Sequence, residues 1–233
     1  MLPKGSFATL ANGFQFHYHD GGQGDVVLFL HGSGTGASGF TNFKKNIDFF
    51  QRNGFRTIVP DLPGYGFSDK PEDEIYTMSF FNNLLIELLD HLNITNCSVV
   101  GNSLGGALAM GLSLEQPERF SKLILMAPGG LEDFSAYQEM PGIKKLLGDF
   151  LGGEMNQEKI EGLLKLFPYD PSFVTKDIIE DRMEILPLMN QQVLASMDIP
   201  NLSEKLKNNQ TPVLAFWGSN DLFIPASGIN KIL

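Results

Sequence analysis

The residue of this chain best placed for chemistry is a serine in a tight, glycine-rich turn. The apolar run 97–100 stops abruptly in Gly101-Asn102-Ser103-Leu104-Gly105, and a helical sequence follows. In a G-x-S-x-G turn between a strand and a helix, the serine occupies a strained backbone position that exposes its hydroxyl group. Ser103 is therefore the predicted nucleophile. The amide N–H of Leu104, at the helix start, is predicted to stabilise an oxyanion. The same pentapeptide also occurs in ordinary strand-to-helix turns.

A second glycine-rich loop offers a partner for this turn. The loop 31–39 contains four glycines and directly follows the apolar run 26–30. It lacks the spacing of a phosphate-binding loop, and an oxyanion loop explains it better. The backbone N–H of Ser33 is then the second predicted oxyanion donor. Gly32 is a predicted substrate-contacting position, because glycine lets the main chain approach the reacting carbonyl. His31 is predicted to be structural, hydrogen-bonded within the loop.

An acid follows the last apolar run. Residues 212–217 read as a strand, and Asp221 comes shortly after it, 118 positions beyond Ser103 (221 − 103). A serine nucleophile followed by an acid is the chain order of strand-turn-helix hydrolases, so Asp221 is the predicted partner of a catalytic histidine. Aspartate after a strand is also common in turns, which leaves a purely structural role open.

Composition limits the class of protein. The chain has 233 residues, a net charge of −10 and a single cysteine, Cys97, which falls in a predicted buried strand. Acidity argues against a nucleic-acid or anionic-membrane partner, and one cysteine excludes an internal disulfide framework. No signal peptide or spanning segment is recognisable. We expect a cytoplasmic protein with a small-molecule substrate; its oligomeric state, with a homo-oligomer among the options, is open.

The elements that must position these residues alternate between buried strands and amphipathic helices. This alternation predicts a doubly wound, mostly parallel α/β sheet whose ligands bind at the carboxyl ends of the strands. Residues 131–210 break the pattern with helix-rich sequence, so we divide the chain into a core at 1–130, a helical lid at 131–210 and a continuation of the core at 211–233. Lid methionines are candidates to line an apolar pocket, or simply to fill the core: Met140, Met155, Met183, Met189 and Met197.

Within this pattern the expected elements are a hairpin formed by 7–10 and 14–19, strands at 26–30, 56–60, 97–100, 122–126 and 212–217, and helices at 40–53, from 77 to about 92 and after Ser103. His17 and His19 share a face of the second hairpin strand. No further ligand stands at a suitable spacing nearby, so they are better read as ordinary strand residues. We predict no metal and no organic cofactor.

The chain resembles the α/β-hydrolase family, and within it the carbon–carbon bond hydrolases of aromatic meta-cleavage products. The resembling motifs are HGSGTGASGFTNF, DLPGYGFSDKP, GNSLGGALAMGLSLEQPERFSKLILMAPGGL and WGSNDLFIP. In the lid, FPYDPSFVTKDIIEDRMEI resembles the family segment whose arginine holds the substrate carboxylate.

The resemblance assigns that role to Arg182, whose forked guanidinium suits a carboxylate. It also places Asn42 and Asn102 near the substrate. On sequence grounds alone, Arg182 is as well read as a surface charge paired with Asp181 or Glu184. The two asparagines also read as capping or turn residues.

The chain departs from the family in one respect. The family's catalytic histidine lies beyond the acid loop, after one more helix and strand, and none of His17, His19, His31 and His91 follows Asp221. We therefore expect an α/β-hydrolase fold with its last strand and helix missing, in a shortened version of a complete hydrolase. Without that base, the activity of this chain by itself is uncertain.

The resemblance implies a serine hydrolase that cleaves a carbon–carbon bond in a 2-hydroxy-6-oxohexa-2,4-dienoate. The alternatives are a general carboxylesterase and, for the chain as given, a non-catalytic binder of a small ligand. Activity on an ester panel beside one dienoate separates the two enzymes. Binding without turnover identifies the third.

Overall fold

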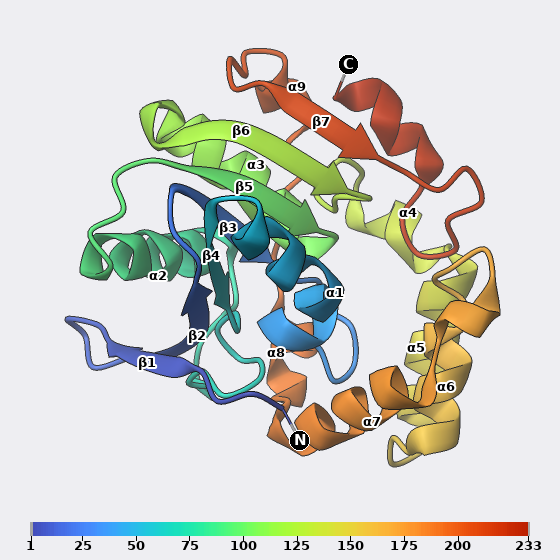
Figure 1. Ribbon diagram of the computed structural model, residues 1–233. Coiled ribbons are helices and arrows are strands. Elements are labelled where there is room, and N and C mark those ends of the chain that lie inside the picture. The colour runs from blue at the N-terminus through green and yellow to red at the C-terminus, as the bar shows by residue number, and fades with distance from the viewer. Residues whose placement is uncertain (1, 233) are drawn as a thin grey trace.

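A computed structural model describes residues 2–232 and shows one twisted sheet with helices on both faces (Figure 1). The strand order is β1-β2-β4-β3-β5-β6-β7. The strands are β1 Ser6–Thr9, β2 Gln15–Gly21, β3 Asp25–Leu30, β4 Phe55–Pro60, β5 Cys97–Asn102, β6 Phe120–Met126 and β7 Val213–Phe216.

The first two strands form the predicted antiparallel hairpin, and the other five run parallel to one another. Gly13 turns the hairpin with φ +86°, and the Asn12 Oδ1 atom accepts from the Phe14 N–H at 3.0 Å. The predicted doubly wound, mostly parallel fold is therefore confirmed. Because the parallel strands share one direction, their carboxyl ends meet at one edge of the sheet.

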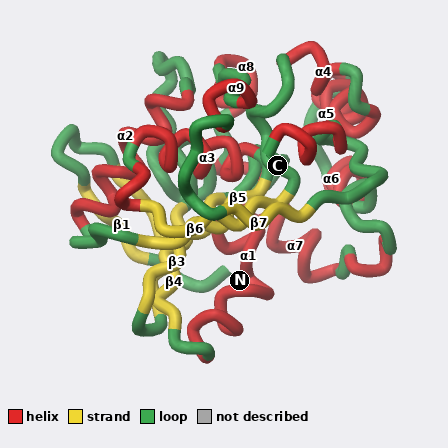
Figure 2. The backbone as a smooth tube through the Cα atoms, turned by 90° about the horizontal axis from the view of Figure 1, so that it is seen from above, coloured by secondary structure: helices red, strands yellow, loops and turns green. Residues whose placement is uncertain are grey.

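The helices are α1 Gly39–Arg52, α2 Met78–His91, α3 Leu104–Glu115, α4 Phe134–Gln138, α5 Pro141–Leu151, α6 Gln157–Leu164, α7 Lys176–Ile185, α8 Gln191–Ser196 and α9 Ser203–Leu206. Short 3₁₀ helices are η1 Pro117–Arg119, η2 Pro171–Phe173, η3 Leu186–Leu188 and η4 Ala226–Lys231. Helices α2 and α3 cover one face of the sheet and α1 covers the other (Figure 2).

The apolar run of β3 explains why the sheet needs helices on both faces. Leu28 and Leu30 pack with α2 and α3, whereas Val27 and Phe29 pack with Phe43 on α1. Successive strand residues point to opposite faces, so a continuous apolar run requires cover on both.

The segment between β6 and β7 carries α4 to α9. Helices α5, α6 and α7 lie beyond the carboxyl ends of β5, β6 and β7 (Figure 1). They pack on one another around a small cluster formed by Met155, Ile160 and Leu163. The division of the chain at residues 130 and 210 stays a prediction.

Candidate active site

Ser103 stands between β5 and α3 in a backbone conformation that few non-glycine residues adopt. Its φ is +52° and its ψ is −114°. Main-chain bonds hold it there: the Ser103 N–H donates to the Met126 carbonyl at 3.1 Å, and its own carbonyl accepts from Gly129 at 2.9 Å and Gly106 at 3.0 Å. Such strain persists only where the surroundings impose it, and it is typical of active sites. Ser103 lines a pocket, and its role as the nucleophile stays a prediction from the sequence and the family.

Three glycines make this turn sterically feasible. A Cβ atom at Gly101 would lie 2.5 Å from the Gly105 carbonyl oxygen, and one at Gly106 would lie 2.6 Å from the Pro128 Cβ. A Cβ at Gly105 would overlap the Leu30 carbonyl oxygen. The start of α3 is thus pressed directly against β3 and β5, at distances that only glycine allows.

The predicted oxyanion loop runs past Ser103. A Cβ on Gly32 would lie 3.0 Å from the Asn102 Oδ1 atom and 3.2 Å from the Ser103 Cβ, so the main chain of the loop lies against the nucleophile. Both Gly32 and Ser33 line the pocket. Leu104 is the first residue of α3, where main-chain N–H groups lack helical partners, and its side chain is buried. The two predicted oxyanion donors thus come from neighbouring strand ends, and their roles stay predictions.

His31 fixes the start of this loop. It is fully buried, its Nδ1 lies 2.8 Å from the Gly32 carbonyl oxygen, and its Nε2 lies 2.9 Å from the Leu62 main-chain nitrogen. Since the Leu62 amide can only donate, Nε2 is the acceptor and Nδ1 carries the proton. Burial lowers the pKa of His31 to about 4. The predicted hydrogen bond within the loop is confirmed, and both ring nitrogens are occupied by structural bonds.

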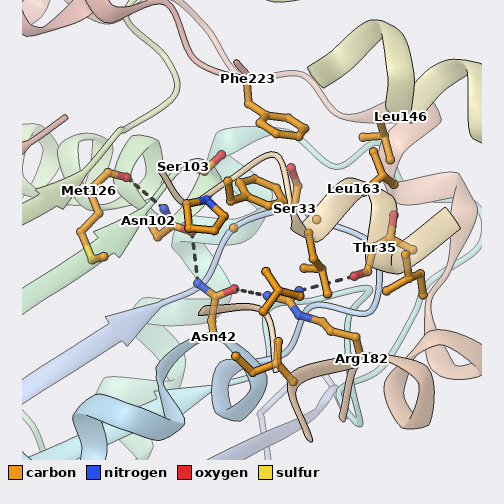
Figure 3. Close-up of a pocket in the computed structure, with 18 of the residues that line it drawn as sticks. Ser33, Thr35, Asn42, Asn102, Ser103, Met126, Leu146, Leu163, Arg182 and Phe223 are labelled. Atoms are coloured by element: carbon orange, nitrogen blue, oxygen red, sulfur yellow. Dashed lines mark hydrogen bonds between the residues drawn. The ribbon is translucent and has the colours of Figure 1, made fainter. Parts of the chain in front are cut away.

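Arg182 reaches the pocket from α7. Its Nη2 donates to the Asn42 Oδ1 at 3.1 Å and its Nη1 approaches the Thr35 carbonyl at 3.4 Å, while its shielded Nε has no partner (Figure 3). Burial lowers the pKa of Arg182 to about 10, partly offset by the nearby Asp181. Both acceptors are neutral. The reading as a surface charge is therefore wrong, because the guanidinium lies inside the pocket without a carboxylate partner among the described residues.

Two asparagines connect Arg182 to the nucleophile turn. The Asn42 Nδ2 donates to the Asn102 Oδ1 at 3.1 Å, and the Asn102 Nδ2 donates to the Met126 carbonyl at 3.0 Å (Figure 3). This carbonyl also accepts from the Ser103 N–H. A single chain of hydrogen bonds thus runs from Arg182 to the strand end beside Ser103. Both asparagines line the pocket, although their predicted contact with substrate is untested.

The pocket that these residues enclose has a volume of about 500 Å³. Its polar part is lined by Ser33, Thr35, Asn42, Asn102 and Arg182. The remainder is mostly apolar, with side chains from the core and the lid: Phe43, Met126, Ile143, Leu146, Ile160, Leu163, Leu164, Phe167, Pro168, Phe173, Val174, Ile178, Phe223 and Ile224. Ser103 lies between Phe223 and the polar side chains in Figure 3.

The apolar wall differs from the methionine lining that the sequence suggested. None of the five lid methionines lines the pocket; Met155 and Met183 pack in the lid cluster, and Met189 and Met197 pack against the main core. Leucine and isoleucine at helical spacing form the wall instead, as with Ile160 and Leu163 on α6. That spacing is a readable signal of one apolar helix face.

The structure places Asp221 in the loop after β7 but does not bring it to the pocket wall. Its Oδ1 accepts from the Phe223 N–H at 2.8 Å and the Ile224 N–H at 2.9 Å. These bonds hold the loop that presents Phe223 and Ile224 to the pocket. None of the described histidines lines the pocket. His17 bonds to Asp61 at 2.8 Å, and the role of Asp221 beside a histidine stays a prediction.

Other site types find little support in residues 2–232. Among these residues, no group of three or more metal-ligating side chains comes together. No helix formed by these residues is both long enough and apolar enough to span a bilayer. Cys97 is buried, and burial raises the pKa of its thiol to about 12. It is therefore an inert core residue rather than a nucleophile.

Comparison with known proteins gives consistent matches. Residues 25–161 match a family model described as the alpha/beta hydrolase fold. The 2-hydroxy-6-oxo-6-phenylhexa-2,4-dienoate hydrolase of Burkholderia cepacia is 35% identical over 222 residues, covering 91% of this chain and 77% of that protein. The 2-hydroxy-6-oxononadienedioate/2-hydroxy-6-oxononatrienedioate hydrolase of Comamonas testosteroni is 34% identical over the same coverage.

A solved structure agrees with these sequences. The meta-cleavage product hydrolase of Pseudomonas fluorescens IP01 superposes with a TM-score of 0.83 at 27% identity, over 98% of this chain and 85% of that one. The architecture around Ser103 is thus shared with proteins of that name.

Proposed function

The chain belongs to the α/β-hydrolase family, and we propose that it hydrolyses a carbon–carbon bond in a 2-hydroxy-6-oxohexa-2,4-dienoate. The observation that carries this proposal is the buried guanidinium of Arg182, which has only neutral acceptors and shares its pocket with Ser103. A buried cation without an anion is unfavourable, so the site favours an anionic ligand. The dienoate carboxylate meets that need.

The pocket's two kinds of wall then orient the substrate. Its carboxylate binds at Arg182 and Asn42, its distal carbonyl lies at Ser103, and its distal substituent enters the region of Leu146, Leu163 and Phe223. Those three side chains are apolar, and the cations of the lining, Arg182 and Lys45, belong to other elements, α7 and α1. We therefore infer an uncharged substituent such as phenyl, because a second carboxylate there would be buried without a partner.

The chemistry follows from this placement. The enol first becomes its keto form, with a proton moved from the 2-hydroxyl to C5. The Ser103 Oγ adds to C6, and the main-chain amides of Ser33 and Leu104 stabilise the oxyanion. The C5–C6 bond breaks, its electron pair returns to the dienoate fragment, and one water hydrolyses the acyl-serine. The products are 2-hydroxypenta-2,4-dienoate and a carboxylic acid.

The proton of Ser103 needs a base. No described histidine lines the pocket. We propose that a histidine, oriented by Asp221, takes this proton.

Product analysis tests the proposal. The full-length protein should convert 2-hydroxy-6-oxo-6-phenylhexa-2,4-dienoate into benzoate and 2-hydroxypenta-2,4-dienoate. Ser103→Ala should lower kcat by at least about 10³-fold. The corresponding nonadienedioate, with a carboxylate on its distal chain, should react with a lower kcat/KM. Turnover of esters but of neither dienoate would contradict the proposal and favour the carboxylesterase.

A further inference from the structure

Lys44, on the core helix α1, forms ion pairs with two carboxylates of α7, the helix that carries Arg182. The Lys44 Nζ on α1 lies 2.7 Å from the Asp177 Oδ2 and 2.5 Å from the Asp181 Oδ2, both on α7. The side chains of Lys44 and Asp181 are each only 17% exposed, whereas that of Asp177 is 62% exposed. The Lys44–Asp181 pair is therefore shielded enough to be a real constraint, unlike most surface ion pairs.

The Lys44–Asp181 pair lies directly beside the anion site. Asp181 immediately precedes Arg182, and its charge partly offsets the lowering of the Arg182 pKa by burial. The α7 main chain is also seated on the oxyanion loop, because a Cβ on Gly36 would overlap the Arg182 carbonyl oxygen. The helix and loop are thus close-packed at Arg182.

Asp181 contacts one cation, Lys44, and its charge acts on a second, Arg182. In the structure it bonds to Lys44, while Arg182 donates to the neutral oxygens of Asn42 and Thr35. If Lys44 lost its charge, Asp181 would become a mostly buried carboxylate without a partner, and such a group seeks the next available cation. That cation is Arg182. An intramolecular carboxylate competes with a dissolved one at high effective concentration.

We propose that Lys44 is a positioning residue that keeps Asp181 away from Arg182 and so leaves the guanidinium free for the carboxylate of the substrate. This inference rests on the proposed function. It assigns specificity for an anionic substrate to an ion pair that does not itself line the pocket. Burial disfavours the charged form of Lys44, but the two aspartates outweigh burial and raise its pKa, so the lysine remains charged at neutral pH.

Steady-state kinetics on the full-length protein test this role. Lys44→Met should raise the KM for the phenyl dienoate about tenfold, with kcat changed less than about twofold. Hydrolysis of the neutral ester p-nitrophenyl acetate, which has no carboxylate, should be unchanged. Lys145→Met is the matched control, since Lys145 pairs with Asp149 within α5. Equal losses on dienoate and ester would show a merely structural role and overturn the proposal.

A second variant separates competition from simple loosening of the lid. Lys44→Met combined with Asp181→Asn removes both the lysine and the competitor, so the KM for the dienoate should return to within about threefold of the wild-type value. A double variant as impaired as Lys44→Met alone would contradict the competition.

Inhibition distinguishes this proposal from the proposed function. Sorbate, a plain dienoate carboxylate, should inhibit ester hydrolysis competitively, with a Ki about tenfold higher in Lys44→Met than in the wild type. An unchanged Ki would overturn the role of Lys44 even if the phenyl dienoate is cleaved. Failure of the wild type to cleave that dienoate would instead overturn the proposed function.

Discussion

The turn around Ser103 and the helix that carries Arg182 face the same pocket, but different forces hold them. The turn is fixed by main-chain hydrogen bonds and by glycines pressed against neighbouring backbone. Helix α7 is fixed by charged and polar side chains. Lys44 forms ion pairs with the two aspartates of α7, and Asn42 accepts a hydrogen bond from Arg182. Bond cleavage requires one fixed geometry, whereas selection of a substrate depends on side chains that substitution can change singly.

This contrast predicts that replacing a glycine by alanine lowers the stability of the protein in the nucleophile turn and raises it in the lid. Gly105→Ala forces a Cβ into the Leu30 carbonyl oxygen, so we expect a loss of at least about 3 kcal/mol in stability and about 100-fold in kcat. Gly148 lies inside the lid helix α5, and a Cβ there would meet no atom within 4 Å, so Gly148→Ala should stabilise the protein by about 0.5–1 kcal/mol. Urea unfolding and turnover measure both.

The contradictory outcome is specific. If Gly105→Ala kept wild-type kcat and stability, the close packing of α3 on β3 would not be what positions the nucleophile.

Acid should weaken the core and leave Asp177, the exposed partner of Lys44, ionised. The folded-state pKa of His31 is about 4, below its ordinary value of 6.5, so the unfolded chain binds the extra proton first. Stability from His31 is thus complete above pH 6.5 and is lost as pH falls toward 4, by about 3 kcal/mol. Asp177, whose pKa its bonds to Lys44 and Thr175 lower to about 2, stays ionised throughout.

Urea unfolding at pH 7 and pH 4.5 checks this effect. Burial also lowers the pKa of His19, which adds a contribution of the same sign. His31→Gln should be less stable than the wild type at pH 7, with a flatter dependence on pH. Equal slopes in both proteins would show that His31 does not cause the loss of stability in acid.

A smaller effect on turnover concerns the link between the two regions. Asn42→Ala removes the acceptor of Arg182 and the donor to Asn102, and it should raise the KM for the phenyl dienoate about five- to tenfold. Asn46→Ala is the control, because Asn46 is exposed one turn further along α1 and does not line the pocket. A larger effect on kcat than on KM would mean that Asn42 acts on the reacting carbonyl.

The same contrast explains how far the sequence alone can lead. The turn around Ser103 is local, so its glycines, strand and helix are readable within ten residues. Arg182 and Asn42 meet across 140 residues, and only a family resemblance suggests that they share a site. The ion pairs of Lys44 with α7 span a similar distance and leave no local pattern, so the sequence does not reveal them. The flexible side chains of the lid methionines suggest that they line the pocket, but none of those five methionines does. The residues that form the pocket wall are better identified by leucine and isoleucine at helical spacing.

The central claim is that the turn at Ser103 performs bond cleavage while Arg182 binds the substrate carboxylate. The most direct test substitutes Arg182 and measures the effect on two substrates, one with a carboxylate and one without. Arg182→Met should lower kcat/KM for the phenyl dienoate by about 100-fold, and leave hydrolysis of p-nitrophenyl acetate within about twofold of the wild type. Arg182→Lys should fall between Arg182→Met and the wild type on the dienoate, since a lysine keeps the charge but not the fork. Selective loss on the dienoate would support two separate sites within one pocket. Equal losses on both substrates would contradict them.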